Sequence, residues 1–242
     1  MFEKIKSFAD SSITIGEARK NPQDWSTLKE VAVFIALFIL MFLVNGLFEF
    51  FFEVMFTDEY QFVYLFSFII IPFIIAFYVV KIEKRSLRSI GLTKKKNIKS
   101  ALTGLLIGFV MLCSVVGIGV ISGQYVFRGV DPSLPFYVIV MFFIGYFIQS
   151  FSEEIYRRGW TLTYFSKKHS VVLSIIICNI VFVLVHLANP GLDIIAVINI
   201  FLVGVVFSIL FLRFDNLLVN GAAHAAWNFT QGTILGFSVS SI

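Results

Sequence analysis

Long runs of apolar residues, separated by short polar segments, dominate the chain. Each run is close to the roughly 20 residues that an α-helix needs to cross a bilayer. The pattern predicts membrane spans at about residues 30–52, 61–81, 98–122, 135–166, 170–188, 193–212 and 216–237. The fold class that follows is all-α: a polytopic membrane helix bundle with about seven transmembrane helices, eight being the alternative.

Polar segments and helix-breaking residues divide this pattern. Asn189, Pro190 and Gly191 predict a tight turn between the fifth and sixth spans. The chain shows no internal repeat and no low-complexity linker, so residues 30–242 are predicted to form a single membrane domain. Residues 1–29 are polar with interspersed apolar positions. They predict a cytoplasmic segment that is either an interfacial helix or a solvated tail.

Composition and charge strengthen the membrane interpretation and give it an orientation. The chain is 58% hydrophobic and its mean hydropathy is +0.91, outside the range of soluble domains. With the N-terminus inside, all of the 19 Lys and Arg residues except Arg128 lie at cytoplasmic positions or on the fourth span. The positive-inside rule therefore predicts a cytoplasmic N-terminus. The net charge of +4 is explained by topology, and no nucleic-acid partner is expected.

The fourth span carries two glutamates and an arginine in a setting that disfavours charge. A charged side chain at bilayer depth costs about 2.5–3.5 kcal/mol on insertion scales, so intramembrane ionisable residues indicate a functional site. Glu154 and Arg158 are spaced i,i+4 in the favourable order for an ion pair. Glu153 points elsewhere around the helix. We expect Glu154 and Arg158 to form a structural pair and Glu153 to be the freer carboxylate, a candidate general base.

The fifth span carries His186. Glu153 lies about 15 residues before the turn between the fourth and fifth spans and His186 about 17 after it, which places both roughly 22–26 Å from that end of the hairpin. Antiparallel packing would bring the two side chains to a similar depth. This expectation requires the fourth span to stay helical to about Ser166.

The last span carries His224 and Asn228, again spaced i,i+4 and therefore on one face. The small residues around them allow neighbouring helices to approach closely. An imidazole and a carboxamide on one face can donate hydrogen bonds to a developing oxyanion. Either residue alone could equally be a hydrogen-bonded packing residue. We interpret the remaining polar residues of the spans mainly as interhelical hydrogen-bonding groups: Asn45, Gln149, Asn179 and Asn199.

Three motifs occur in order on these spans. Residues 153–159 read EEIYRRG and resemble EExxxRG, residues 182–186 read FVLVH and resemble FxxxH, and residues 224–228 read HAAWN and resemble HxxxN. A weaker similarity covers residues 87–92, LRSIGL. In these motifs the chain resembles the CAAX protease and bacteriocin-processing family (CPBP, also called Abi) of intramembrane glutamic endopeptidases. The resemblance covers about residues 135–237.

The resemblance implies peptide-bond hydrolysis within the membrane, without a metal ion or another cofactor. Glu153 with His186 would activate water, and His224 and Asn228 would stabilise the oxyanion. Glu154 and Arg158 would organise the site. Some family members process prenylated CAAX proteins. Others take part in peptide export or bacteriocin immunity, or have regulatory roles. The expected partners are thus a membrane-bound or lipidated peptide or protein and membrane lipid, in a multi-pass protein of a bacterial plasma membrane.

Other functions remain open at this stage. Glu153, His186 and His224 could instead supply a carboxylate and two imidazoles to a zinc ion, although no HExxH sequence is present. The chain could also be a non-catalytic scaffold or a bacteriocin-immunity protein of the same fold. A transporter would fit intramembrane charges, but such proteins often show an inverted-repeat pattern, which is not seen in this sequence.

Overall fold

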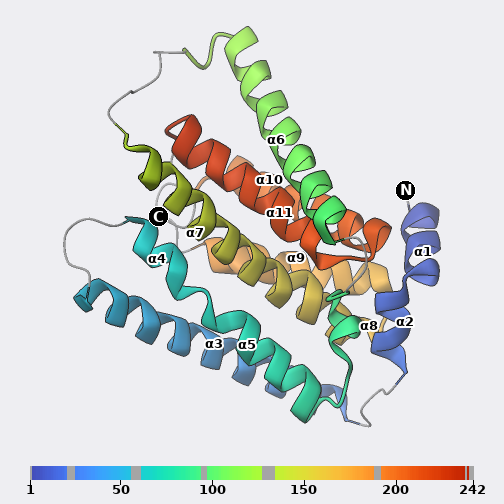
Figure 1. Cartoon of the computed structure of the whole chain (residues 1–242). Coiled ribbons are helices and arrows are strands. Elements are labelled where there is room, and N and C mark those ends of the chain that lie inside the picture. Colours follow the sequence, from blue (N-terminus) through green and yellow to red (C-terminus); the bar gives the residue numbers. More distant parts are fainter. Residues whose placement is uncertain are drawn as a thin grey trace.

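The computed structural model describes residues 2–20, 25–55, 61–93, 97–126, 134–187, 192–237 and 239. All regular structure in these residues is helical, and the helices form one bundle (Figure 1). The elements are α1 Phe2–Ser11, α2 Ile13–Arg19, α3 Thr27–Met55, α4 Gln61–Ser67, α5 Ile70–Phe77, η1 Tyr78–Ile82, η2 Leu87–Ile90, α6 Asn97–Ile121, α7 Phe136–Glu154, η3 Ile155–Leu162, α8 Thr163–Ser166, α9 Val171–His186, α10 Ile194–Phe214, α11 Leu217–Phe229 and η4 Thr230–Ile234.

Each predicted span corresponds to a helical segment. Among the described residues, five of these segments are long and apolar enough to cross a membrane: Thr27–Met55, Tyr64–Ile82, Asn97–Ile121, Phe136–Ser166 and Ile194–Phe214. The fifth predicted span is the shorter apolar helix α9. The last is α11 with η4, which carries the polar HxxxN motif. The all-helical membrane fold is therefore confirmed. The turn predicted at residues 189–191 lies outside the described residues, as does Arg128.

Helix α11 lies between α6 and α7 and packs against both (Figure 1). Gly104 and Gly108, one turn apart on α6, face α11, where added Cβ atoms would lie 2.8 Å from the Ala222 Cβ and 2.7 Å from the Ala223 carbonyl carbon, respectively. Such distances require the backbone to move. The small residues around His224 thus allow close helix packing, as the sequence predicts, and this contact fixes the position of the HxxxN motif.

The fourth predicted span is continuous from α7 through η3 to α8, but η3 is a π-helix. The π-helix covers Ile155–Leu162, all of it buried. The Thr161 hydroxyl donates to the Tyr156 carbonyl, five residues earlier, at 3.0 Å. The predicted helical continuity is confirmed, but the π geometry of η3 differs from the ordinary α geometry expected from the sequence. Wide π turns within α-helices occur frequently at functional sites, and this one begins directly after Glu154.

The weak LRSIGL motif contacts the EExxxRG motif. A Cβ at Gly159 would lie 3.1 Å from the Ile90 carbonyl oxygen, so the glycine allows η2 to approach η3 closely. Gly91 adopts a left-handed conformation (φ 78°), which glycine reaches without strain. Its carbonyl oxygen accepts a hydrogen bond from the backbone N–H of Leu217, the first residue of α11, at 3.0 Å. The LRSIGL segment thereby links two of the motif-bearing helices.

The N-terminal segment is anchored to the bundle by Asp215, at the turn between α10 and α11. The Asp215 carboxylate accepts hydrogen bonds from the Ser12 hydroxyl at 2.7 Å and from the backbone N–H groups of Ile13 and Thr14 at 3.1 and 2.9 Å. Ile5 and Ile15 belong to the main hydrophobic core. Residues 2–20 are therefore not a solvated tail: they contain α1 and α2, both packed against the bundle.

A buried ionic cluster lies beyond the end of the Phe136–Ser166 segment. Glu83 is paired with Arg85 at 2.6 Å and with Lys167 at 2.9 Å, and these side chains are almost fully enclosed. Lys168 pairs with Glu30, at the start of α3, at 3.0 Å. Segments that the sequence analysis placed on the cytoplasmic side thus meet at one end of the bundle, together with α2 and the α10–α11 turn.

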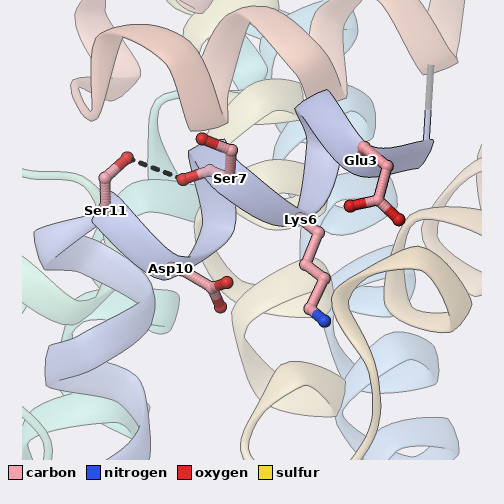
Figure 2. A pocket seen from close by; sticks show the side chains of 5 residues that line it. All are labelled: Glu3, Lys6, Ser7, Asp10 and Ser11. Atoms are coloured by element: carbon pink, nitrogen blue, oxygen red, sulfur yellow. Dashed lines mark hydrogen bonds between the residues drawn. The ribbon is translucent and has the colours of Figure 1, made fainter.

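The exposed side of α1 carries a shallow polar depression of about 550 Å³ (Figure 2). Glu3, Lys6, Ser7, Asp10 and Ser11 line it. The Ser11 hydroxyl donates to the backbone carbonyl of Ser7 at 2.9 Å, as the dashed line shows. All five residues are on one helix, and no residue of the three motifs lines this depression.

Candidate active site

The second glutamate of the EExxxRG motif forms the predicted ion pair. Arg158 Nη1 lies 2.7 Å from Glu154 Oε1, and both side chains are fully buried. The other terminal nitrogen of Arg158 donates to the Gly204 carbonyl of α10 at 2.8 Å and to the Asn179 amide oxygen of α9 at 3.3 Å. Arg158 therefore ties η3 to two neighbouring helices, which is the structural part that the sequence assigned to it.

The first glutamate is more accessible but is also paired. The Glu153 side chain is 14% exposed, whereas Glu154 is fully enclosed. Arg157 Nη2 forms an ion pair with Glu153 Oε2, and the Gln149 amide donates to Glu153 Oε1 at 2.7 Å. Glu153 is thus the more accessible of the two carboxylates, but the prediction that it is free of an ion pair is wrong. The i,i+4 spacing of Glu153 and Arg157 is the signal in the sequence that indicates this second pair.

His224 on α11 lies between the two glutamates. Its Nδ1 is 3.2 Å from Glu154 Oε1, and its Nε2 is 4.0 Å from Glu153 Oε2. Asn220, one turn earlier on α11, donates to Glu154 Oε2 at 3.4 Å. The first and third motifs are therefore brought into contact, with one imidazole facing both carboxylates.

Asn228 joins the same group of residues through Gln149. Its amide nitrogen lies 3.3 Å from the Gln149 amide oxygen and 3.3 Å from the Ser150 hydroxyl, and it donates to both. Gln149 in turn donates to Glu153. His224 and Asn228 share one face of α11, as the i,i+4 spacing predicts, and the structure directs this face at α7. Gln149, which the sequence predicts to be an interhelical hydrogen-bonding group, thereby connects Asn228 to Glu153.

His186 is linked to Glu153 through two intermediate side chains. His186 Nδ1 lies 2.8 Å from the Phe182 carbonyl oxygen, and the Phe182 ring meets the imidazole edge-on at 4.3 Å between centroids. The Arg157 guanidinium lies 3.8 Å from the centroid of the same Phe182 ring. The FxxxH motif therefore contacts the first motif through Phe182 and Arg157, the residue that also holds Glu153.

The other polar residues of the spans differ in whether they make the predicted interhelical hydrogen bonds. Asn179 and Gln149 make interhelical hydrogen bonds, as predicted. Asn199 is exposed on α10, so the described structure gives no support to the interhelical hydrogen bond predicted for it. The side-chain oxygen of Asn45 is buried, and within the described part of the chain it has no hydrogen-bond partner, which is also contrary to expectation.

The arrangement of the acidic and histidine side chains can be compared with what a zinc site requires. A zinc site of the proposed type needs Glu153, His186 and His224 to converge on one point. In the described residues, no group of three or more His, Cys, Asp or Glu side chains is arranged to hold a metal ion. What the structure brings together instead is two carboxylates around one imidazole, with amide groups beside them.

A comparison with protein families matches the region of the chain that carries these residues. Residues 135–230 match the Rce1-like type II CAAX prenyl endopeptidase family. The family predicted from the three motifs is thereby confirmed for this Rce1-like segment. The segment contains all three motifs, so the family match supports a membrane protease. No curated protein and no solved structure matches the chain.

Proposed function

We propose that this chain is an intramembrane endopeptidase that uses a glutamate to activate water, and that it cleaves a membrane-associated peptide or protein. The observation that carries the proposal is the convergence of Glu153, Glu154 and His224 from α7 and α11. A fully buried and a largely buried carboxylate beside one imidazole would be costly as packing alone. Their placement within the Rce1-like segment supports a hydrolytic site.

In the proposed reaction Glu153 is the general base, because it is the more accessible glutamate of the pair. It takes a proton from water while the oxygen attacks the peptide carbonyl carbon, and the proton then passes to the departing amine as the C–N bond breaks. His186 helps to orient the water. No metal ion or other cofactor takes part.

His224 and Asn228 would stabilise the oxyanion that forms on the carbonyl oxygen. Nδ1 of His224 lies 3.2 Å from Glu154 Oε1, which leaves Nε2 to face the reacting group. His224 would donate from Nε2 to the developing oxyanion. The Asn228 amide makes only long hydrogen bonds of 3.3 Å in this structure, with which a developing oxyanion can compete.

We further propose that the chain is a multi-pass protein of a bacterial plasma membrane with its N-terminus in the cytoplasm. The basic segments predicted to face the cytoplasm meet at one end of the bundle through contacts such as Arg19 to the Ser166 carbonyl at 3.0 Å. A shared location of these segments is what the positive-inside rule requires.

The deciding experiment compares membrane-peptide ends by mass spectrometry in cells that express the wild-type chain or Glu153→Gln. We expect a defined set of new termini with the wild type and its loss with Glu153→Gln and with His186→Ala. Glu53→Gln is the matched control, since Glu53 is an exposed glutamate on α3. Full cleavage by Glu153→Gln would refute the proposed base. An unchanged cellular phenotype in that variant would favour a scaffold or immunity protein.

A second measurement separates this mechanism from zinc catalysis. Cleavage by the purified protein should persist after dialysis against a chelator, and metal analysis should find no stoichiometric zinc. Loss of activity on chelation that zinc restores would instead assign the carboxylate and imidazoles to a metal.

A further inference from the structure

Arg157 occupies a position that the EExxxRG motif leaves open, yet its side chain is almost fully enclosed. Its side chain is 5% exposed. It lies on η3 between the two motif residues Glu154 and Arg158, and the preceding turn carries Glu153. A buried cation needs compensating contacts, so the contacts of Arg157 show what it does.

One contact is the ion pair with Glu153, four residues earlier. The other is the stacking of the guanidinium over Phe182 on α9 at 3.8 Å, a close cation–π distance. The Phe182 ring in turn meets the His186 imidazole edge-on at 4.3 Å. The guanidinium therefore touches the candidate base on one side and the ring that borders the candidate histidine on the other.

Arg157 and Arg158 differ in the contacts that hold them. Arg158 binds Glu154, Asn179 and the Gly204 carbonyl, which ties three helices together. Each guanidinium also has one buried nitrogen, Nε of Arg158 and Nη1 of Arg157, for which the described part of the chain gives no hydrogen-bond partner. Packing between helices explains Arg158. Arg157 is held instead by Glu153 and by the Phe182 ring, two residues of the motifs, so its position needs a separate reason.

We infer that Arg157 is a positioning residue that aligns the two water-activating groups across the α7–α9 interface. Its ion pair orients the Glu153 carboxylate, and its stacking holds Phe182 and through it His186. This inference rests on the proposed function for the meaning of that alignment. The alignment itself is a geometric property that can be measured without substrate.

The first test uses the histidines as probes, because the chain has only 3 of them. Purified full-length protein with isotopically labelled histidine is compared by NMR as wild type, Arg157→Lys and Phe182→Leu. We expect the His186 ring signals, assigned from their absence in His186→Ala, to shift in both variants. The signals of His169, which lies beyond α8, should stay in place.

Arg213→Lys provides the matched control. Arg213 also lies over a phenylalanine ring, that of Phe8 at 5.7 Å, but it is exposed at the end of α10. This variant should leave the His186 signals unchanged. A wild-type His186 signal in both Arg157→Lys and Phe182→Leu would overturn the inference.

The second test is kinetic. A displaced base or histidine lowers the rate of the chemical step more than substrate binding, so Arg157→Lys should lower kcat by about 10–100-fold with little change in KM. Arg157→Lys and Phe182→Leu should not be additive, because both break one chain of contacts. Unchanged kcat, or strictly additive losses, would contradict a positioning role.

The two proposals can fail separately. If Glu153→Gln cleaves normally, the proposed function is wrong, whereas the NMR comparison still measures the alignment. If Glu153→Gln is inactive while Arg157→Lys keeps wild-type kinetics and wild-type His186 signals, only the role of Arg157 is refuted.

Discussion

Nε2 of His224 on α11 lies 4.0 Å from the Glu153 carboxylate on α7, while Nδ1 of the same ring lies 3.2 Å from Glu154. One imidazole therefore separates two acidic groups that are adjacent in sequence. The contact joins the first and third motifs, about 70 residues apart in the chain, into one site. Because α6 packs against α11, a substitution on α6 that displaces α11 should also disturb the site.

Asn228 should contribute to the rate of cleavage and only weakly to substrate binding. Loss of one oxyanion donor typically costs about 10²–10³ in kcat. Asn228→Ala should show a loss of this size, measured by steady-state cleavage of a substrate identified from the cellular termini. Asn199→Ala, at an exposed position on α10, is the control and should cleave normally. Equal rates in the two variants would remove Asn228 from the mechanism.

Arg158→Ala should destabilise the bundle. The substitution leaves Glu154 as a fully buried charge without its main partner and removes two bonds to α9 and α10. Breaking a buried pair in this way costs about 3–5 kcal/mol. Thermal unfolding in detergent should show a clear drop in Tm relative to the wild type. Arg213→Ala tests the loss of an exposed arginine, and a similar Tm in both variants would argue against the structural pair.

Two glycines on α6 should respond oppositely to the same substitution. A methyl group at Gly108 would lie 2.7 Å from the Ala223 carbonyl carbon, whereas Gly117 has no atom within 4 Å of that position. Gly108→Ala should destabilise by about 1–3 kcal/mol through overpacking. Gly117→Ala should be neutral or stabilising by up to about 1 kcal/mol, because alanine favours helices.

Unfolding measurements on both variants check this prediction. Gly108→Ala should also reduce cleavage, since it displaces α11 next to His224. Equal stability of the two variants would mean that α6 and α11 are not in close contact at Gly108.

The buried ionic cluster should make stability depend on pH in the alkaline range. Burial lowers the pKa of Lys167 from its ordinary value of 10.5, and the opposing effect of Glu83 at 2.9 Å only partly offsets it. The folded state then binds fewer protons at this site than the unfolded state, so the site's contribution to stability rises as pH increases through the lowered pKa towards 10.5.

Lys167→Met should remove that contribution. The free energy of unfolding of the wild type should therefore increase more steeply with alkaline pH than that of Lys167→Met, in chemical denaturation series at matched ionic strength. Parallel curves would show that Lys167 does not titrate differently in the folded and unfolded states.

Local spacing along the chain determined much of this protein. Apolar runs gave the helical segments and the membrane fold, because a span needs about 20 apolar residues. The i,i+4 spacing gave the Glu154–Arg158 pair and the shared face of His224 and Asn228, because residues four apart lie on one side of a helix. The motifs gave the family for residues 135–230.

Only the tertiary structure decided how these parts meet. The π-helix of η3 packs against η2 and α9 and leaves no plain signal in periodicity. The position of His224 between two carboxylates follows from the glycine contacts of α6 with α11. Arg157 could be paired with Glu153 from spacing, but its stacking on Phe182 required the register of α9. Contacts between distant segments arise from how helices slide and rotate against one another, which sequence spacing within each helix does not fix.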